Sequence, residues 1–153
     1  MEIVSLRAPE RKFAVIGIAL GFFVSCILAL GDELFLPNFE FYWGSQLVVI
    51  AIILLLRPRP AIVSALSVYL ALMLIGFKAW LGIRSNLNAD GGVWFLYLVL
   101  LIGATVGCLV GTYWLRKKKT FPSFQAVGVV AATAIGGSTL SMIVGCYTVF
   151  YCH

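Results

Sequence analysis

The chain has 153 residues, of which 62% are hydrophobic and only 11% are charged, and its mean hydropathy is +1.06. A soluble domain usually carries about 25% charged residues, because its surface faces water. This composition excludes a soluble globular domain. We expect one domain that is embedded in a lipid bilayer.

Five apolar segments have roughly the length that a membrane-spanning helix needs, which is about 20 predominantly apolar residues. They are residues 13–31, 42–56, 61–81, 93–115 and 124–151. Lipid offers no hydrogen-bond partner to an open backbone, so such segments must be helical. The predicted fold is an all-α integral membrane protein, a compact bundle of five transmembrane helices.

The first span, 13–31, follows two basic residues and ends before Asp32. Basic residues, an apolar stretch and the small residues at 29–31 are also typical of a secretory signal peptide, and 23–26 is a weak match to a lipoprotein cleavage site. The apolar stretch is long for a signal peptide. We therefore interpret it as a retained first span.

The remaining spans are separated by residues that break helices or stop insertion. The second span is the shortest, and residues 42–44 extend it as an interfacial collar. The prolines in 57–60 end it and make it an antiparallel neighbour of the third span. The fourth span stops at the basic run 116–119. The fifth is longer than required, so we expect a tilt or a bend near Gly136 and Gly137.

The loop charges predict the orientation of the bundle. Basic loop residues favour the cytoplasmic side when loops are short. With a cytoplasmic N-terminus, the inner side receives Arg7, Arg11, Lys12, Arg57, Arg59 and the run 116–119, and the outer side receives only Lys78 and Arg84. We expect five spans with the N-terminus inside and the C-terminus outside, in a bacterial inner membrane.

Small residues at four-residue spacing mark faces where two membrane helices can approach closely. They are Gly17 and Gly21 in the first span, Gly103, Gly107 and Gly111 in the fourth, and, in the fifth, Gly128, Ala132 and Gly136 with Gly137, Ser141 and Gly145 on an adjacent stripe. We favour packing of these faces within one chain. A homo-oligomer, or docking onto a partner's helix, is the alternative.

Polar residues inside the spans are few. Ser138 and Ser141 belong to a hydroxyl-rich part of the fifth span that offers a polar path, although such hydroxyls more often bond to backbone. Gln46 is expected to form an interhelical hydrogen bond. Lys78, near the outer end of the third span, is expected to reach the interface, with a salt link to Asp32 or Glu33 as a refinement.

The residue types that support catalysis or cofactor binding do not form a recognisable site. None of the four cysteines belongs to a Cys-x-x-Cys pair. We interpret them as packing residues, with a Cys26–Cys152 disulfide as the alternative in an oxidising periplasm. Cys152 and His153 supply too few ligands for a metal. The sequence predicts no enzyme, cofactor, metal site or nucleic-acid partner.

An outer segment combines acidic residues with large aromatic ones. Exposed aromatic side chains beside charges are typical interface anchors, whereas an aromatic belt at the membrane surface is the simpler interpretation. The candidate partner-binding residues in this outer loop are Asp32, Glu33, Phe35, Phe39, Phe41 and Trp43.

The functional prediction follows from these features. We expect a non-enzymatic membrane protein that acts through protein–protein contacts, besides its contacts with lipid. It would be an accessory subunit, or an immunity protein against a membrane-active toxin. The alternative is a small oligomeric channel or transporter with the fifth span lining its path.

Overall fold

The computed structural model describes residues 7–32, 34–83, 91–117, 122–145 and 147, and these form five helices and no strand. The helices are α1 (Arg7–Leu30), α2 (Phe35–Leu55), α3 (Pro60–Ile83), α4 (Gly91–Lys117) and α5 (Ser123–Gly145). Over the described ranges, all five are long and apolar enough to span a membrane. The predicted all-α bundle is therefore confirmed, and its architecture is that of a multi-pass membrane protein.

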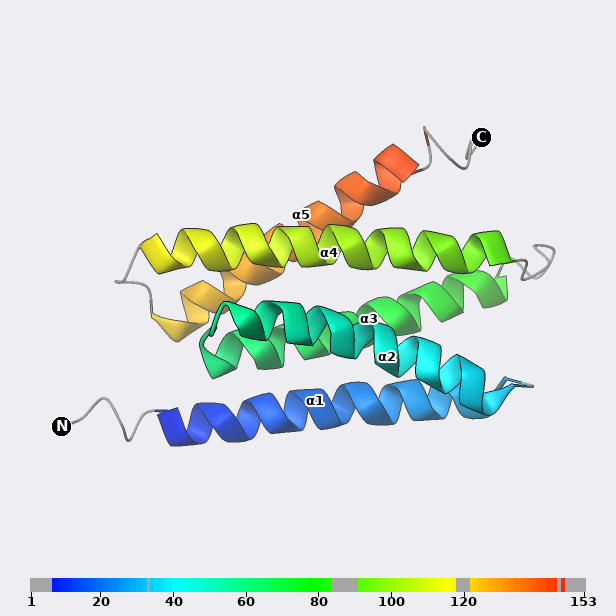
Figure 1. Ribbon diagram of the computed structural model, residues 1–153, viewed down its shortest axis with the longest axis horizontal. Coiled ribbons are helices and arrows are strands. Elements are labelled where there is room, and N and C mark those ends of the chain that lie inside the picture. Colours follow the sequence, from blue (N-terminus) through cyan, green and yellow to red (C-terminus); the bar gives the residue numbers. More distant parts are fainter. Residues whose placement is uncertain (1–6, 33, 84–90, 118–121, 146, 148–153) are drawn as a thin grey trace.

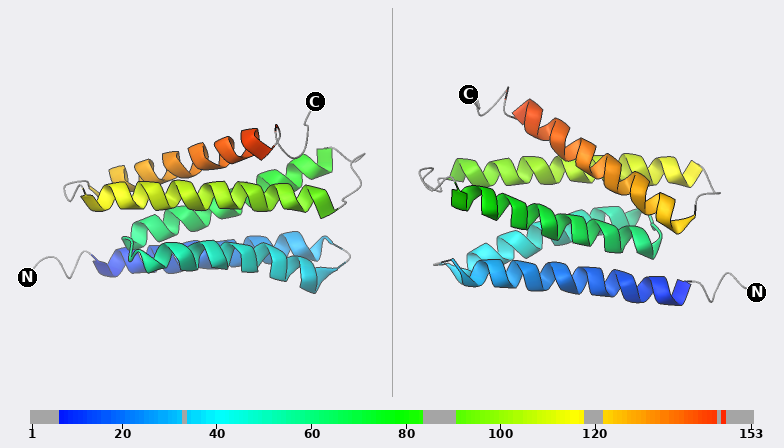
Figure 2. Two further views of the ribbon diagram at one scale, coloured as in Figure 1. Left: turned by 45° about the horizontal axis from the view of Figure 1, so that its top comes forward. Right: turned by 180° about the vertical axis from the view of Figure 1, so that it is seen from behind.

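The five helices run alternately up and down the bundle. Figures 1 and 2 show α1 at one edge, α4 and α5 at the opposite edge and α3 between them. Helix α2 packs beside α1, α3 and α4. The most extensive contacts join α4 to α5 and α1 to α3. The core lies between the central helices, where Tyr42, Ile53, Leu70, Leu74 and Tyr97 are fully buried.

Charged residues divide between the two ends of the bundle. Arg11, Lys12, Arg57, Arg116 and Lys117 are all exposed at the end where α2 meets α3, which we call the basic end. Asp32 and Glu40 lie at the opposite end, the acidic end, where α1 meets α2. The charge segregation of the sequence is thus retained in the fold.

The second helix begins earlier than the sequence predicted, at Phe35 rather than near residue 42. Pro37 lies in the first turn, where backbone N–H groups have no partner within the helix, so it removes no helical hydrogen bond. The aromatic segment is consequently the start of a membrane-spanning helix and not a loop.

The last helix is continuous from Ser123 to Gly145, and the predicted end of that span lies outside the described residues.

The connection between α2 and α3 contains a backbone conformation that L-residues rarely adopt. Arg57 has a φ of 48°, and its N–H donates to the carbonyl of Leu54 at 2.9 Å. This left-handed residue after the end of a helix is the position at which glycine is usually found. The side chain of Arg57 therefore imposes a backbone cost on the turn.

We expect Arg57→Gly to be more stable than Arg57→Ala by about 1 kcal/mol, because only glycine lacks the Cβ that strains a left-handed conformation. Both variants remove the same charge, so their difference isolates the backbone. The free energy of unfolding in detergent measures it. Equal stabilities of the two variants would contradict the strain assigned to this turn.

The glycines of α4 allow α5 to approach its backbone. A Cβ at Gly107 would meet the carbonyl oxygen of Thr133, and one at Gly103 would meet the carbonyl oxygen of Gly137. On the other side of the bundle, a Cβ at Gly17 would lie 3.0 Å from the Cα of Ser64 in α3. Small residues therefore produce the two closest helix contacts.

Only one of the two small-residue stripes that the sequence indicates on α5 meets α4. A Cβ at Gly128 or at Gly136 would have nothing within 4 Å among the described residues. Both glycines and Ala132 are exposed. The expectation that this stripe packs inside the chain is wrong. The expectation for the adjacent stripe is confirmed, because Gly137 and Ser141, together with Thr133, make the contact with α4.

Candidate functional site

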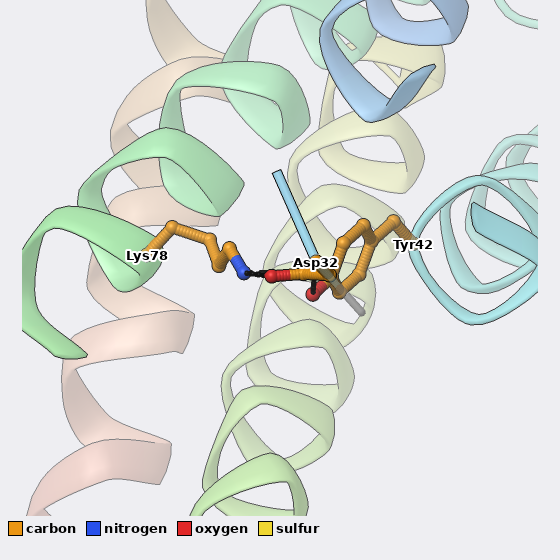
Figure 3. Close-up of polar contacts among 3 residues, drawn as sticks. All are labelled: Asp32, Tyr42 and Lys78. Carbon is orange, nitrogen blue, oxygen red and sulfur yellow. Dashed lines mark hydrogen bonds and ion pairs between the residues drawn. The ribbon is translucent and has the colours of Figure 1, made fainter. Parts of the chain in front are cut away.

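A charged network lies at the acidic end of the bundle (Figure 3). The Nζ atom of Lys78, in α3, lies 2.6 Å from Oδ1 and 2.9 Å from Oδ2 of Asp32, which follows α1. The hydroxyl of Tyr42, in α2, donates to Oδ2 at 2.7 Å. One carboxylate therefore ties three helices together. The salt link proposed as a refinement is the arrangement that the structure shows.

Aromatic rings enclose the ammonium group. Nζ of Lys78 lies 5.4 Å from the ring centroid of Tyr42 and 5.7 Å from that of Trp94, which brings α4 to the network. Such distances allow cation–π attraction. The rings of Trp94 and Tyr97 also pack on Phe77, with centroids 5.5 Å and 5.2 Å away.

The carboxyl of Asp32 is stabilised in its charged form. Burial raises its pKa, but the hydrogen bonds from Lys78, Tyr42 and Asn38 and the positive charge of Lys78 outweigh burial, so the pKa lies below the ordinary value of 3.8. Both charged side chains are only 21% exposed. The carboxylate is therefore held in its charged form, in which it can join the three helices.

The predicted partner-binding aromatics pack mostly on one another and on the chain. Phe35 stacks on Phe39 with centroids 5.8 Å apart, and Phe39 and Trp43 both contact Phe22 of α1. The predicted residues Phe35, Phe39 and Trp43 are half-buried, as is Phe41 beside Trp94. Glu33 lies outside the described residues.

Other side chains form the exposed surface at this end. Leu34 and Leu36 are each 65% exposed, and Pro37 and Glu40 are also exposed. The predicted anchors are thus half-buried against the chain, and Leu34, Leu36, Pro37 and Glu40 form the outward surface. The helical periodicity of this segment is the signal in the sequence that would have separated the half-buried aromatic residues from the exposed residues.

A second polar group lies in the interior. Nε2 of Gln46 donates to Oγ of Ser25 in α1 at 3.4 Å, and both residues are fully buried. This confirms the interhelical hydrogen bond expected for Gln46. Among the described residues, Oε1 of Gln46 and the hydroxyl of Tyr97 are buried without a hydrogen-bond partner.

The hydroxyls of the predicted polar path lie at helix–helix contacts. Ser138 is buried, lies 2.7 Å from the hydroxyl of Tyr69, and donates to the carbonyl of Leu100 at 3.3 Å. Ser141 lies against Gly103 of α4. Thr133 and Thr139 donate to carbonyls of their own helix. The contacts of Ser138 and Ser141 join α5 to α3 and α4.

Metal-ligating residues are scattered over the described part of the chain. In that part, no group of three or more His, Cys, Asp or Glu side chains could hold a metal ion. Cys26 and Cys108 are free thiols. Cys152 and His153 lie outside the described residues, as does the disulfide that was the alternative for Cys26.

Known proteins give no further guide to this site. No protein family, curated protein or solved structure matched the chain in the comparisons. The fold and the site alone define the class, a multi-pass helical membrane protein with a tightly held charged network at one end.

Sequence reasoning identified Asp32 and Lys78 but missed Tyr42 and Trp94. Tyr42 was interpreted as part of an interfacial collar. Nothing local to the sequence shows that it turns its hydroxyl toward a carboxylate. The contact with Trp94 depends on how α4 lies beside α2 and α3, which no local pattern specifies.

Proposed function

We propose that this chain is a non-enzymatic membrane protein that binds a helix of another membrane protein along α5. The observation that supports the proposal is the exposed stripe of Gly128, Ala132 and Gly136. It has the four-residue spacing at which small residues let helices pack. The neighbouring stripe of the same helix already makes such a contact with Gly107 of α4.

Contact with lipid alone does not explain why this stripe consists of small residues. Lipid tails are as apolar as leucine, so helix association in a bilayer depends on close van der Waals packing. Elsewhere the outward surface carries large side chains, such as Phe23, Ile102 and Leu140, each more than 60% exposed. A smooth strip among bulky residues favours a partner backbone over acyl chains.

The basic end faces the cytoplasm of a bacterial inner membrane, in agreement with the positive-inside rule. The partner is a larger membrane assembly, in which the chain is an accessory subunit, or a membrane-active toxin, against which it is an immunity protein. Ser138 and Ser141, the hydroxyls of the alternative channel path, are engaged in contacts with α3 and α4, which favours a binding role over a channel.

Photo-crosslinking in cells tests the binding of α5. A photoreactive residue at Ile135, beside the stripe and 53% exposed, is expected to give a discrete larger species. The photoreactive residue placed instead at Val106 of α4, which is 52% exposed, serves as the matched lipid-facing control. Ala132→Ile is expected to lower the yield at Ile135 about tenfold, equal to roughly 1.4 kcal/mol of lost association.

The identity of the crosslinked species separates the partners. Two differently tagged copies of the chain report a homo-oligomer, and mass spectrometry of the species identifies a different protein. Crosslinks of equal yield at Ile135 and Val106, or a yield that Ala132→Ile does not change, would exclude binding along this stripe.

A further inference from the structure

A layer of polar side chains lies inside the bundle, deeper than the charged network of the acidic end. Gln46 follows Tyr42 by about one turn of α2. Tyr97 follows Trp94 by about one turn of α4. Both helices begin at the acidic end, so each step leads toward the middle of the bundle, where Ser25 of α1 accepts a hydrogen bond from Gln46. Three helices that are long and apolar enough to span a membrane therefore bring polar groups together in the interior.

The hydrogen bonds within this layer are incomplete. Oε1 of Gln46 and the hydroxyl of Tyr97 have no hydrogen-bond partner in the part of the chain that the structure describes. Both side chains are 0% exposed, so the medium around the bundle does not reach them. A polar group that is taken out of water loses stability unless a new partner replaces its hydrogen bonds. The two atoms therefore point to a partner that is not a side chain of these described segments.

The two unpartnered atoms complement each other chemically. An amide oxygen only accepts hydrogen bonds, whereas a tyrosine hydroxyl can donate one. The hydroxyl of Tyr97 lies close to the side chains of Ser45 and Gln46, so both atoms belong to one neighbourhood. A molecule that donates to Oε1 and accepts from the hydroxyl satisfies both atoms, and water does so with a single oxygen.

The ligand at this layer must be small. Ser25, Gln46 and Tyr97 are all fully buried, so none of them lies on a surface that an organic molecule could approach. A Cβ at Gly21 of α1 would lie 3.1 Å from Oε1 of Gln46 and 3.3 Å from the ring of Trp43. Even a methyl group at Gly21 would thus crowd the amide. These contacts favour a single water molecule over any larger ligand.

We propose that Gln46 and Tyr97 hold one structural water molecule inside the bundle. The water accepts from the hydroxyl of Tyr97 and donates to Oε1 of Gln46, so it joins α4 to α2. Ser45 already donates its own proton to the carbonyl of Tyr42, and its oxygen accepts the second hydrogen of the water. The water then makes about three hydrogen bonds, as buried waters usually do. The inference does not depend on the proposed function, because the layer is internal and does not include the stripe of α5.

X-ray radiolysis of the purified full-length chain in detergent tests this assignment. The beam converts water, including water bound inside a protein, into hydroxyl radicals that oxidise the nearest side chains, and mass spectrometry locates the oxidised residues. We expect Tyr97 to be oxidised several-fold more than Tyr42. Tyr42 is equally buried, donates its hydroxyl to Asp32 and lies nearer to the acidic end, so radicals from bulk water would reach it first.

Two variants connect the oxidation to the layer. Gln46→Met removes the amide oxygen but keeps a side chain of similar length, and it is expected to lower oxidation of Tyr97 several-fold. Ser138→Ala is the matched control, because it removes a buried hydroxyl from the contact of α5 with α3, away from the layer. It is expected to leave oxidation of Tyr97 unchanged.

Tyr97→Phe tests the same water if Gln46→Met does not fold, as judged by circular dichroism and gel filtration. It removes only the hydroxyl. Loss of a hydroxyl that is bonded to water is expected to lower the unfolding temperature in detergent. Loss of a buried hydroxyl that has no partner would instead leave that temperature unchanged or raise it, because its desolvation cost disappears.

Three results would overturn the proposal. The first is oxidation of Tyr97 no greater than that of Tyr42, which would mean that no water is bound beside its ring. The second is oxidation of Tyr97 that a folded Gln46→Met variant does not reduce. The third is an unfolding temperature of Tyr97→Phe that equals or exceeds that of wild type.

Discussion

Lys78→Met is expected to lower the free energy of unfolding by about 2 kcal/mol, because it leaves the part-buried carboxylate of Asp32 without its cation. Methionine keeps the apolar stem that packs beside Tyr42 and Trp94, so the loss reports the charge. Thermal or denaturant unfolding in detergent measures it. Glu40→Gln, at an exposed carboxylate of the same end, should stay within about 0.5 kcal/mol of wild type.

A double-mutant cycle separates the ion pair from its surroundings. Asp32→Asn keeps an acceptor for the Tyr42 hydroxyl but removes the charge. Combined with Lys78→Met, it is expected to cost less than the sum of the two single variants, because each single variant leaves one charge unpaired. Strictly additive losses would show that Lys78 and Asp32 do not stabilise each other.

The same pair determines how stability depends on pH. The pKa of Asp32 is lower in the folded chain than its ordinary value of 3.8. The folded state therefore binds fewer protons, and the contribution of Asp32 is complete above pH 3.8 and is lost as the pH falls through the folded pKa. The stability difference between wild type and Asp32→Asn should accordingly shrink on acidification in that range and stay constant near neutral pH.

Gly107→Ala is expected to cost about 3 kcal/mol, because its Cβ would meet the backbone carbonyl of Thr133, which no side-chain rotation can move away. The two helices must separate, and contacts along the whole α4–α5 pair weaken. Unfolding in detergent, together with proteolysis of the separated α5, measures the effect.

Gly136→Ala is the matched control for this substitution. It changes the same residue type in a membrane-spanning helix, but at a position with nothing within 4 Å of the new Cβ among the described residues. We expect its stability within about 0.5 kcal/mol of wild type. Equal losses in both variants would mean that glycine content, and not the α4–α5 contact, determines stability.

The sequence by itself determined the helices and the segregation of charge. Apolar length and helix-breaking residues are local properties, so 61–81 and 93–115 predicted α3 and α4 to within a few residues. The start of α2 was missed because hydropathy falls where aromatic and polar residues mix, although the backbone there still prefers to be helical in a bilayer.

Only the tertiary structure decided which face of each helix packs against a neighbouring helix. Two stripes of small residues on α5 have the same spacing, and a sequence pattern cannot show which of them meets Gly107. Asp32 and Lys78 are 46 residues apart, and their pairing depends on the ends of α1 and α3 lying side by side. Local sequence patterns specify which residues lie on each face of a helix. The rotation and tilt of each helix against its neighbours select the face that is buried, and those depend on packing over the whole bundle.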